Sequence, residues 1–578
     1  MNCAIIFKKG SVIMLKLKDY KYERPNMEEV EEKFNALLAE FNICNSAEEQ
    51  IEVMKRINKL RSEIDSMAVL VDIRHNVDTR DEFYDEENEF FNENYPKIEE
   101  FINDFYRALL NSKFRGDLEE KLGTHLFNVA DVALQSFRPE IIEDLQEENK
   151  LVSQYIKLKA SARIDFEGEE RNLSEMSTFV ESKDREMRKK AQKAITEYYV
   201  GNESKFDDIY DKLVKVRHRM AVKLGYKNFV ELAYKRLGRS DYNADMVATY
   251  RKQVLESLVP LTVKLREKQA KRLGLDSLKY YDEVLAFLSG NATPKGEPDW
   301  IVEQATKMYE ELSSETSEFI HYMIDRELMD LVAKKGKSGG GYCTYISEYK
   351  APFIFSNFSG TSGDVDILTH EAGHAFMKYC VQDFEIPEYM YPTYEACEIH
   401  SIGMEFLTWP WMEKFFKEDV EKYKFNHLNE AILFIPYGVT VDEFQHRVYE
   451  NPDMTPTERK LTWREIEKKY LPAKDYDGVD FYERGGYWFK QSHIFDSPFY
   501  YIDYTLAKVC AFQIWAKSME NREKAWEDYL RLCKAGGQGP FLELLKIGNI
   551  KNPFENGTIE EVVRPLERYL DNVNQSKL

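Results

Sequence analysis

The segment 364–375, with the sequence DVDILTHEAGHA, constrains this chain more than any other feature. It contains the pattern His-Glu-x-x-His, formed by His370, Glu371 and His374. On a helix, residues four apart lie one turn apart on the same face, so both imidazoles can bind one ion. Asp364 is of a type that caps a helix start. The sequence therefore predicts a helix that carries two metal ligands.

Glu371 is suited to act on a water molecule beside such an ion. It is rotated by about 100° from His370 around the helix axis, so it can hydrogen-bond water instead of binding the metal. Zinc held by three protein ligands keeps a fourth position for water and lowers the pKa of that water from about 15.7 towards 7. A neighbouring carboxylate can take the proton and pass it to a leaving amine. The pattern indicates metal-assisted amide hydrolysis; the alternative is two helix histidines that belong to the surface or the core.

Two histidines leave a zinc ion one protein ligand short, and the next predicted helix offers carboxylates. The helix expected at 393–407 has Glu395, Glu398 and Glu405 along one face. Three carboxylates on one face are unfavourable if they are buried without a cation. From the spacing alone, either Glu395 or Glu398 can complete the site. His400 points elsewhere on this helix and is expected near the site or at the surface.

Two segments before the motif could receive an extended peptide. The segment 351–358, APFIFSNF, predicts a short strand, which as an edge strand could pair with a peptide by β-augmentation. The segment 334–342, KKGKSGGGY, predicts a mobile glycine loop that could close over the peptide. The alternative for this loop is a plain hairpin connection.

A histidine and several tyrosines are concentrated in the segment 485–504, GGYWFKQSHIFDSPFYYIDY. Such side chains can donate hydrogen bonds to an oxyanion and orient a peptide carbonyl. The alternative is an aromatic packing belt, because the chain has 36 tyrosines.

Apolar residues at three- and four-residue spacing predict a mainly α fold with little sheet. The segment 161–172 alternates apolar and polar residues around Gly168, which predicts a small β-hairpin. The segment 290–298 is rich in Gly, Pro and Asn and suggests a lobe boundary. The expected division is an amino-terminal extension and lead-in at 1–26, a helical lobe at 27–290 and a catalytic lobe at 291–578.

Charge and cysteine usage limit the partners and the compartment. The net charge of −22 argues against a nucleic-acid backbone or an anionic membrane as the main partner, and no apolar run approaches the ~20 residues of a membrane helix. Seven scattered cysteines without Cys-x-x-Cys spacing fit a reducing compartment, and Cys343 and Cys397 are expected to be packing residues. The amino terminus lacks the features of a signal peptide, and Met14 could be the natural start. We expect a cytoplasmic protein.

Three blocks of the chain resemble the signature blocks of the thimet-type (M3) metallopeptidases: FIFSNFSGTSGDVDILTHEAGHAF, CEIHSIGMEF and HIFDSPFYYIDY. The most similar branch is that of oligoendopeptidase F and Pz-peptidase. Weaker likeness extends upstream through RIDFEGEERNLSEM, DREMRKKA and AVKLGYKNFVELAY, so that it covers most of the chain after about residue 20.

The resemblance implies a mostly helical, two-lobed fold around a deep substrate channel, with a small β-sheet near the active site. It implies one Zn²⁺ ion with His370 and His374 as ligands and Glu371 as the general base. The implied activity is that of a zinc endopeptidase that hydrolyses internal bonds of short, unfolded oligopeptides.

The resemblance also selects the third zinc ligand. In the family this ligand is a glutamate followed three positions later by a serine and seven positions later by another glutamate. That register matches Glu398, Ser401 and Glu405. Glu398 is therefore the implied ligand in preference to Glu395, and Glu405 is the implied hydrogen-bond acceptor behind the ligands.

The downstream histidine and oxyanion-stabilising tyrosines of the family match best to His493, Tyr501 and Tyr504. The chain departs here from the glycine-rich version of the pattern in the thimet branch. The register of the tyrosines can therefore differ by one residue, with Tyr500 as the competitor of Tyr501.

Two other functions fit parts of the sequence. One is a metallocarboxypeptidase with a similar helical fold, which would leave peptides blocked at both ends intact. The other is a non-catalytic peptide-binding protein with a vestigial site, which would hold peptides without cutting them. Intact His370, Glu371, His374 and Glu398 argue against the second alternative.

Overall fold

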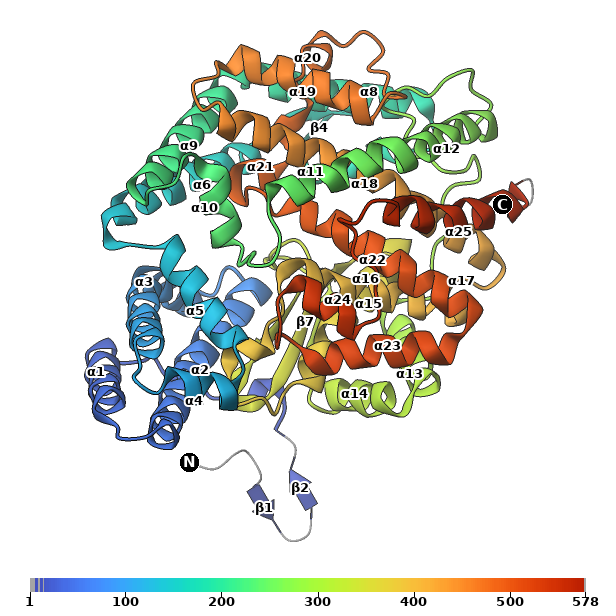
Figure 1. Ribbon diagram of the computed structural model, residues 1–578. Coiled ribbons are helices and arrows are strands. Elements are labelled where there is room, and N and C mark those ends of the chain that lie inside the picture. The colour runs from blue at the N-terminus through green and yellow to red at the C-terminus, as the bar shows by residue number, and fades with distance from the viewer. Residues whose placement is uncertain (1–5, 9–10, 14, 576–577) are drawn as a thin grey trace. The chain divides into compact units, whose positions relative to one another are not determined.

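A computed structural model of the 578-residue chain describes residues 6–8, 11–13, 15–575 and 578 (Figure 1). Met14, the start suggested by the sequence, lies outside these residues. Helices dominate the described part of the chain, so the prediction of a mainly α fold is confirmed. None of the helices in that part is long and apolar enough to cross a membrane.

The chain forms two compact units, and each unit consists of three separate stretches of sequence. Unit 1 comprises Met1–Leu134, Thr293–Val420 and Gln513–Ile550, and unit 2 comprises Gln135–Ala292, Glu421–Phe512 and Lys551–Leu578. The lobes expected at 27–290 and 291–578 divide the chain in a different way and stay a prediction.

Unit 1 contains helices, a two-stranded sheet and a three-stranded sheet. Its α-helices are α1 (Met27–Ile43), α2 (Ala47–Val77), α3 (Glu82–Leu110), α4 (Arg115–Leu122), α5 (His125–Ser136, which ends in unit 2), α13 (Pro298–Leu312), α14 (Ser314–Asp325), α15 (Ser362–Cys380), α16 (Tyr394–Leu407), α17 (Glu413–Phe416), α23 (Arg522–Ala535) and α24 (Phe541–Ile547). Its strands are β1 (Ile6–Lys8), β2 (Ser11–Ile13), β5 (Met329–Val332), β6 (Tyr342–Ile346) and β7 (Ala351–Phe358).

Helices α1 and α2 show how the predicted apolar spacing becomes a core. Asn26 and Ser46 are the N-caps of the two helices, and their side chains accept hydrogen bonds from backbone N–H groups of the first turn. Phe34, Phe41 and Ile57 then lie together in a buried cluster that α1, α2 and α3 share. The burial of these side chains, rather than helix propensity alone, stabilises these helices.

The sheet that precedes the metal helix has the strand order β5-β7-β6. Strand β7 pairs in parallel with β5 and antiparallel with β6, so it is the central strand. The prediction that the segment 351–358 is an edge strand open to a peptide is therefore wrong. The sequence of this segment predicted a strand, but its pairing with β5 and β6 depends on contacts that the segment alone does not show.

The glycine loop joins β5 to β6, which are not neighbours in the sheet, so a plain hairpin connection is excluded as well. Lys337 extends from the loop to the Asp330 carboxylate at 2.6 Å. The Ser338 N–H donates to the Asn76 carbonyl at 2.8 Å, and the Asn357 amide donates to the Gly340 carbonyl at 2.9 Å. These bonds anchor the loop to α2 and β7, and its closure over a peptide stays a prediction.

Helix α15 lies against β7, as Figure 1 shows for this part of unit 1. The chain turns between them through Ser359 and Gly360, whose N–H groups donate to the Asp364 carboxylate at 2.9 and 2.7 Å. Asp364 thus fixes the turn that leads into the helix, while Thr361 occupies the N-cap position. The helix predicted over the motif is present, and its entry angle is set by one buried carboxylate.

Unit 2 is almost entirely helical. Its α-helices are α6 (Ile142–Ala160), α7 (Ser177–Val180), α8 (Arg185–Gly201), α9 (Glu203–Lys223), α10 (Phe229–Arg236), α11 (Ala244–Gln253), α12 (Val259–Arg272), α18 (Val420–Glu450), α19 (Pro456–Tyr470), α20 (Asp480–Glu483), α21 (Ser492–Asp496), α22 (Tyr501–Glu520, which ends in unit 1) and α25 (Thr558–Asn572). The predicted hairpin is present as β3 (Ile164–Phe166) and β4 (Glu169–Arg171), joined by Glu167 and Gly168 with φ of 52° and 82°.

Candidate active site

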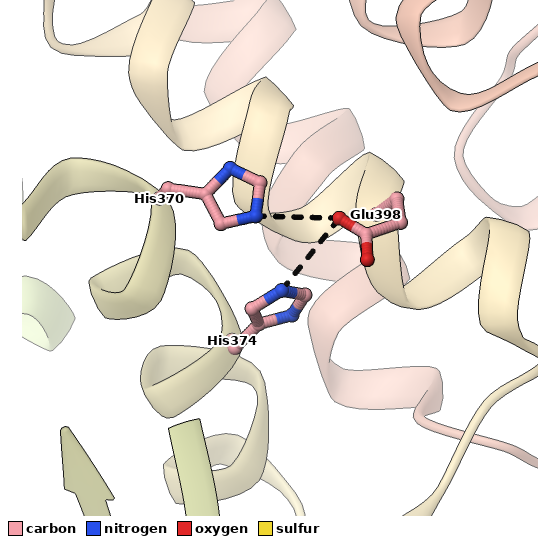
Figure 2. Close-up of side chains that lie close together, drawn as sticks. All are labelled: His370, His374 and Glu398. Carbon is pink, nitrogen blue, oxygen red and sulfur yellow. Dashed lines mark ion pairs between the residues drawn. The ribbon is translucent and has the colours of Figure 1, made fainter. Parts of the chain in front are cut away.

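Helices α15 and α16 bring the three predicted metal ligands together (Figure 2). The Nε2 atoms of His370 and His374 lie 3.3 and 3.8 Å from Oε2 of Glu398. One ligand atom from each residue lies within 4.8 Å of the others. Both histidines come from one face of α15, and their rings point toward the carboxylate on α16. This donor set, two imidazoles and one carboxylate, fits a zinc ion.

Gly373 allows α15 and α16 to approach closely enough for this convergence. A Cβ atom at this position would lie 2.4 Å from the His400 carbonyl oxygen and 2.7 Å from Cα of Ser401. Both of these are backbone atoms of α16, which cannot move aside as a flexible side chain can. Position 373 therefore requires glycine because of the close contact between the two helices, and not because of metal binding itself.

A second set of hydrogen bonds orients the ligands. Oε1 of Glu405 lies 2.6 Å from Nδ1 of His370, which leaves Nε2 of the imidazole to face Glu398. The Ser401 hydroxyl donates to Oε2 of Glu398 at 3.1 Å. Partners of this kind fix the tautomer and the orientation of metal-binding side chains. Glu405 thus lies where the resemblance to the M3 family places a hydrogen-bond acceptor.

The Glu398 carboxylate, a predicted ligand, and its partner His370 are electrostatically complementary. Burial acts against the charged form of Glu398, but its hydrogen bond to His370 and the nearby imidazoles lower its pKa to about 2. Burial also acts against protonation of His370, yet Glu398 and Glu405 raise its pKa well above the ordinary value. Burial lowers the pKa of His374 to about 3. The cluster attracts positive charge, as a cation site requires.

Glu371 lies beside the ligands in a largely buried position, with 7% of its surface exposed. Burial, together with the neighbouring carboxylates, raises its pKa to about 7, although His370 acts in the opposite direction. A carboxylate with a pKa near neutrality is well matched to accepting and returning a proton.

The remaining polar residues of α16 do not join the ligands. Glu395 is buried but is not part of the group of possible metal ligands. His400 is fully buried, so the surface position, one of the two expected for it, is excluded. Its carbonyl accepts a hydrogen bond from Tyr529 at 2.7 Å. Burial lowers the pKa of the His400 imidazole to about 4. His400 thus contributes to the packing of α16 on α23.

The other predicted site residues lie together in unit 2. The ring of His493 on α21 has its centroid 4.9 Å from that of Tyr501 and 5.9 Å from that of Tyr504, both on α22. The two tyrosine rings are 5.7 Å apart. The Tyr500 ring also lies near His493, at 6.0 Å between centroids, so either register of the tyrosines brings a phenol ring close to His493.

Sequence reasoning missed the residues that hold this cluster in place. The Arg239 guanidinium donates to Asp503 and to the Phe499 carbonyl, both at 2.7 Å, and the Arg239 and Asp503 side chains are 0% exposed. Phe499 has a φ of 69°, a strained value for an aromatic residue, and its N–H donates to the Gln445 amide at 2.9 Å. Arg239 and Gln445 are distant in sequence, and no spacing motif marks them.

Comparisons with known proteins cover nearly the whole chain. The family model described as "Peptidase family M3" matches residues 178–563, and that of the "Peptidase M3 N-terminal domain" matches residues 17–137. The solved structure of Pz peptidase A with an inhibitor is 59% identical, covers 97% of this chain and 100% of its own, and has a TM-score of 0.92.

Two relatives are similar over shorter or more divergent alignments. An oligoendopeptidase F homolog of Borreliella burgdorferi is 24% identical over 413 residues, which are 70% of this chain and 68% of the relative. An oligoendopeptidase F homolog of Lactococcus lactis subsp. lactis is 22% identical over 533 residues, which are 87% of this chain and 86% of the relative.

Proposed function

Since the chain belongs to peptidase family M3 and is a metalloendopeptidase, we propose that His370, His374 and Glu398 hold its catalytic metal ion. The observation that carries this proposal is the convergence of the three ligand atoms within 4.8 Å of one another, from two helices that cross at Gly373. Zn²⁺ suits these donors, and when bound it would polarise the scissile carbonyl and acidify water.

Glu371 is the proposed general base. Its place one residue after a ligand, and its pKa of about 7, support a role in which it accepts the proton of the attacking water. The same carboxyl group then returns that proton to the leaving amine. Glu405 holds the Nδ1 side of His370 throughout, so that the ligand does not turn during the reaction.

His493, Tyr501 and Tyr504 are the proposed donors to the peptide carbonyl oxygen. Imidazole N–H and phenol O–H groups placed where negative charge develops lower the barrier, and removal of one such donor typically lowers turnover by about 10²–10³. Support comes from the mutual packing of the three rings in unit 2. Tyr500 is the alternative to Tyr501.

The proposed substrates are short, unfolded oligopeptides cut at internal bonds. The names of the relatives, oligoendopeptidase F and Pz peptidase, support this class. A cytoplasmic location is also proposed, on the support of the scattered cysteines, six of which are free in the described part of the chain.

A single variant tests the assignment of Glu371. Glu371→Gln keeps all three ligands, so we expect one bound zinc ion per chain and turnover lower by about 10²–10⁴ on an internally quenched peptide blocked at both ends. Glu413→Gln, which changes an exposed glutamate of α17, is the matched control and should cut at the wild-type rate. Near-wild-type cleavage by the first variant would exclude Glu371 as the base. Peptide binding without cleavage by the zinc-loaded wild type would instead favour a vestigial site.

A further inference from the structure

Gln491, just before α21, connects His493 of the predicted cluster to Tyr437, which lies outside that cluster. Its amide nitrogen Nε2 lies 2.8 Å from Nδ1 of His493. Its amide oxygen accepts a hydrogen bond from the Tyr437 hydroxyl at 2.9 Å. The Gln491 backbone N–H is fixed as well, by donation to the Trp488 carbonyl at 2.9 Å. Both ends of this side chain are therefore occupied.

The orientation of the amide determines which nitrogen of His493 carries the proton. A neutral imidazole has one N–H donor and one acceptor nitrogen, and a neighbouring hydrogen bond selects between them. Because the Tyr437 hydroxyl donates to the amide oxygen, the NH₂ group faces His493. Nδ1 then accepts, and the proton must be on Nε2.

The surroundings of both partners favour this arrangement. Burial lowers the pKa of His493, with Asp496 acting in the opposite direction, so that the ring is neutral near pH 7. Burial raises the pKa of Tyr437 well above its ordinary value, so the phenol keeps its proton. The Tyr437 ring also packs edge-on against that of Tyr501, at 5.9 Å between centroids.

We propose that Gln491 is a positioning residue that, held by Tyr437, keeps His493 in the tautomer with its proton on Nε2. That proton is then the one available to the peptide carbonyl oxygen. This inference rests on the proposed role of His493 and names the residues that prepare it.

A simpler role for Gln491 would be to line a cavity. Tyr437 and Gln491 do border a cavity of about 340 Å³ in unit 2, together with Tyr487, Lys474 and Lys490. A cavity-lining glutamine needs only solvent, however, whereas here both halves of the amide have protein partners with good distances. The experiment must therefore detect the tautomer and not only the integrity of the fold.

The direct test is ¹⁵N NMR of the zinc-loaded, full-length protein with labelled histidine. The His493 signals are identified by their loss in His493→Gln, and the long-range ¹H–¹⁵N pattern distinguishes the two tautomers. We expect the Nε2–H form in the wild type. In Gln491→Glu the carboxylate can only accept, so the proton should move to Nδ1. Gln154→Glu, the same change at an exposed position of α6, should leave the tautomer unchanged.

Kinetics provide a second readout. Gln491→Glu should lower kcat by about 10²-fold, as expected for the loss of one oxyanion donor, with little change in KM and with one zinc ion retained. Tyr437→Phe keeps the amide but removes the group that orients it, so we expect a smaller loss and a mixture of tautomers. This variant keeps the ring packing on Tyr501 and covers the case in which Gln491→Glu fails to fold.

The outcomes separate the two proposals. An Nδ1–H form in the wild type, or an unchanged tautomer in Gln491→Glu, would overturn the role of Gln491. Wild-type turnover by His493→Gln would instead refute the role of His493, whatever the tautomer of the wild-type ring.

Discussion

The proposed metal ligands of unit 1 and the histidine–tyrosine cluster of unit 2 are built by different means. His370 and His374 share one helical turn, and Glu398 comes from the next α-helix along the chain. Helix periodicity and one close crossing are sufficient to assemble them. The cluster instead lies on both sides of the turn before α22, and two side chains remote in sequence hold this turn: Arg239, in the segment after α10, and Gln445 on α18.

This difference predicts different sensitivities. A change in the proposed ligand set should remove the metal and leave α15 and α16 folded, because these helices also pack directly on each other at Gly373. A change in the remote supports of the cluster should reduce stability and turnover together, while the metal stays bound. The following variants test this contrast, in order of their expected effect on turnover.

The largest effect should follow from Glu398→Gln. The amide removes the negative charge and one ligand oxygen, so the site should lose its zinc, and turnover should fall to background. We expect a thermal midpoint close to that of the metal-free wild type. Measurement of metal content, turnover and thermal unfolding on the same sample tests all three.

Glu395→Gln is the matched control for this variant, since Glu395 is also a buried glutamate of α16 but lies outside the ligand group. It should keep one zinc ion per chain. Retention of zinc by Glu398→Gln, with loss by Glu395→Gln, would reverse the assignment of the third ligand.

The second effect concerns Arg239→Ala. Removal of one partner from a buried ion pair typically costs about 3–5 kcal/mol in unfolding free energy, because the buried Asp503 carboxylate loses its arginine. Release of the Phe499 carbonyl should also let Tyr501 and Tyr504 shift, so turnover falls while zinc stays bound. Urea unfolding and metal analysis measure the two consequences.

Arg163→Ala provides the comparison within unit 2. Arg163 and Glu170 form an exposed pair at 3.2 Å, and such pairs contribute only about 0–1 kcal/mol. If both variants lose the same small amount of stability and keep full turnover, the remote ion pair does not position the cluster.

The sequence predicted the group of possible metal ligands in unit 1, but not the side chains that support the cluster in unit 2. His370, Glu371 and His374 follow from helical spacing, because a fixed period converts sequence distance into spatial distance. The hairpin at 161–172 follows from local turn chemistry in the same way. Glu398 could not be separated from Glu395 by spacing, and the choice between them came from the resemblance to the M3 family.

The predictions that failed depended on contacts between distant segments. The segment 351–358 was correctly predicted as a strand, but its central place in the sheet is set by pairing with β5 and β6. His400 is buried because α23 packs over it. No sequence pattern marks Arg239 or Gln491. Their roles depend on a buried ion pair and on an amide hydrogen-bonded at both ends, and these contacts are visible only in the folded structure.

A third and smaller effect is expected at Gly373. In Gly373→Ala the added methyl group meets the backbone of α16, and such overpacking costs about 1–3 kcal/mol, more than the about 1 kcal/mol that alanine gains in a helix. Separation of the helices should weaken zinc binding, so that turnover falls only when zinc is limiting. In Gly201→Ala nothing lies within 4 Å of the new methyl group, and we expect no loss of stability or turnover.

The smallest effect on turnover is expected for Lys378, which lies one turn after His374 on α15. Here the buried charge that affects stability lies in unit 1, beside the proposed ligands. Arg239, one of the buried arginines of unit 2, faces a carboxylate, whereas in the described part of the chain Lys378 has no carboxylate within ion-pair distance. Its ammonium donates to the Met390 carbonyl at 2.8 Å and lies over the Tyr391 ring. Burial lowers its pKa from 10.5 to about 7.

A lowered lysine pKa makes the folded state bind fewer protons than the unfolded state between the two values. Stability linked to this group therefore rises with pH from about 7 towards 10.5, and the full penalty for the buried charge is present below pH 7. Lys378→Met removes the charge, so we expect it to stabilise the protein at pH 6 and to lose this advantage by pH 10, with turnover unchanged. Unfolding midpoints of both proteins across this range decide the matter: a constant difference would mean that the lysine does not titrate there.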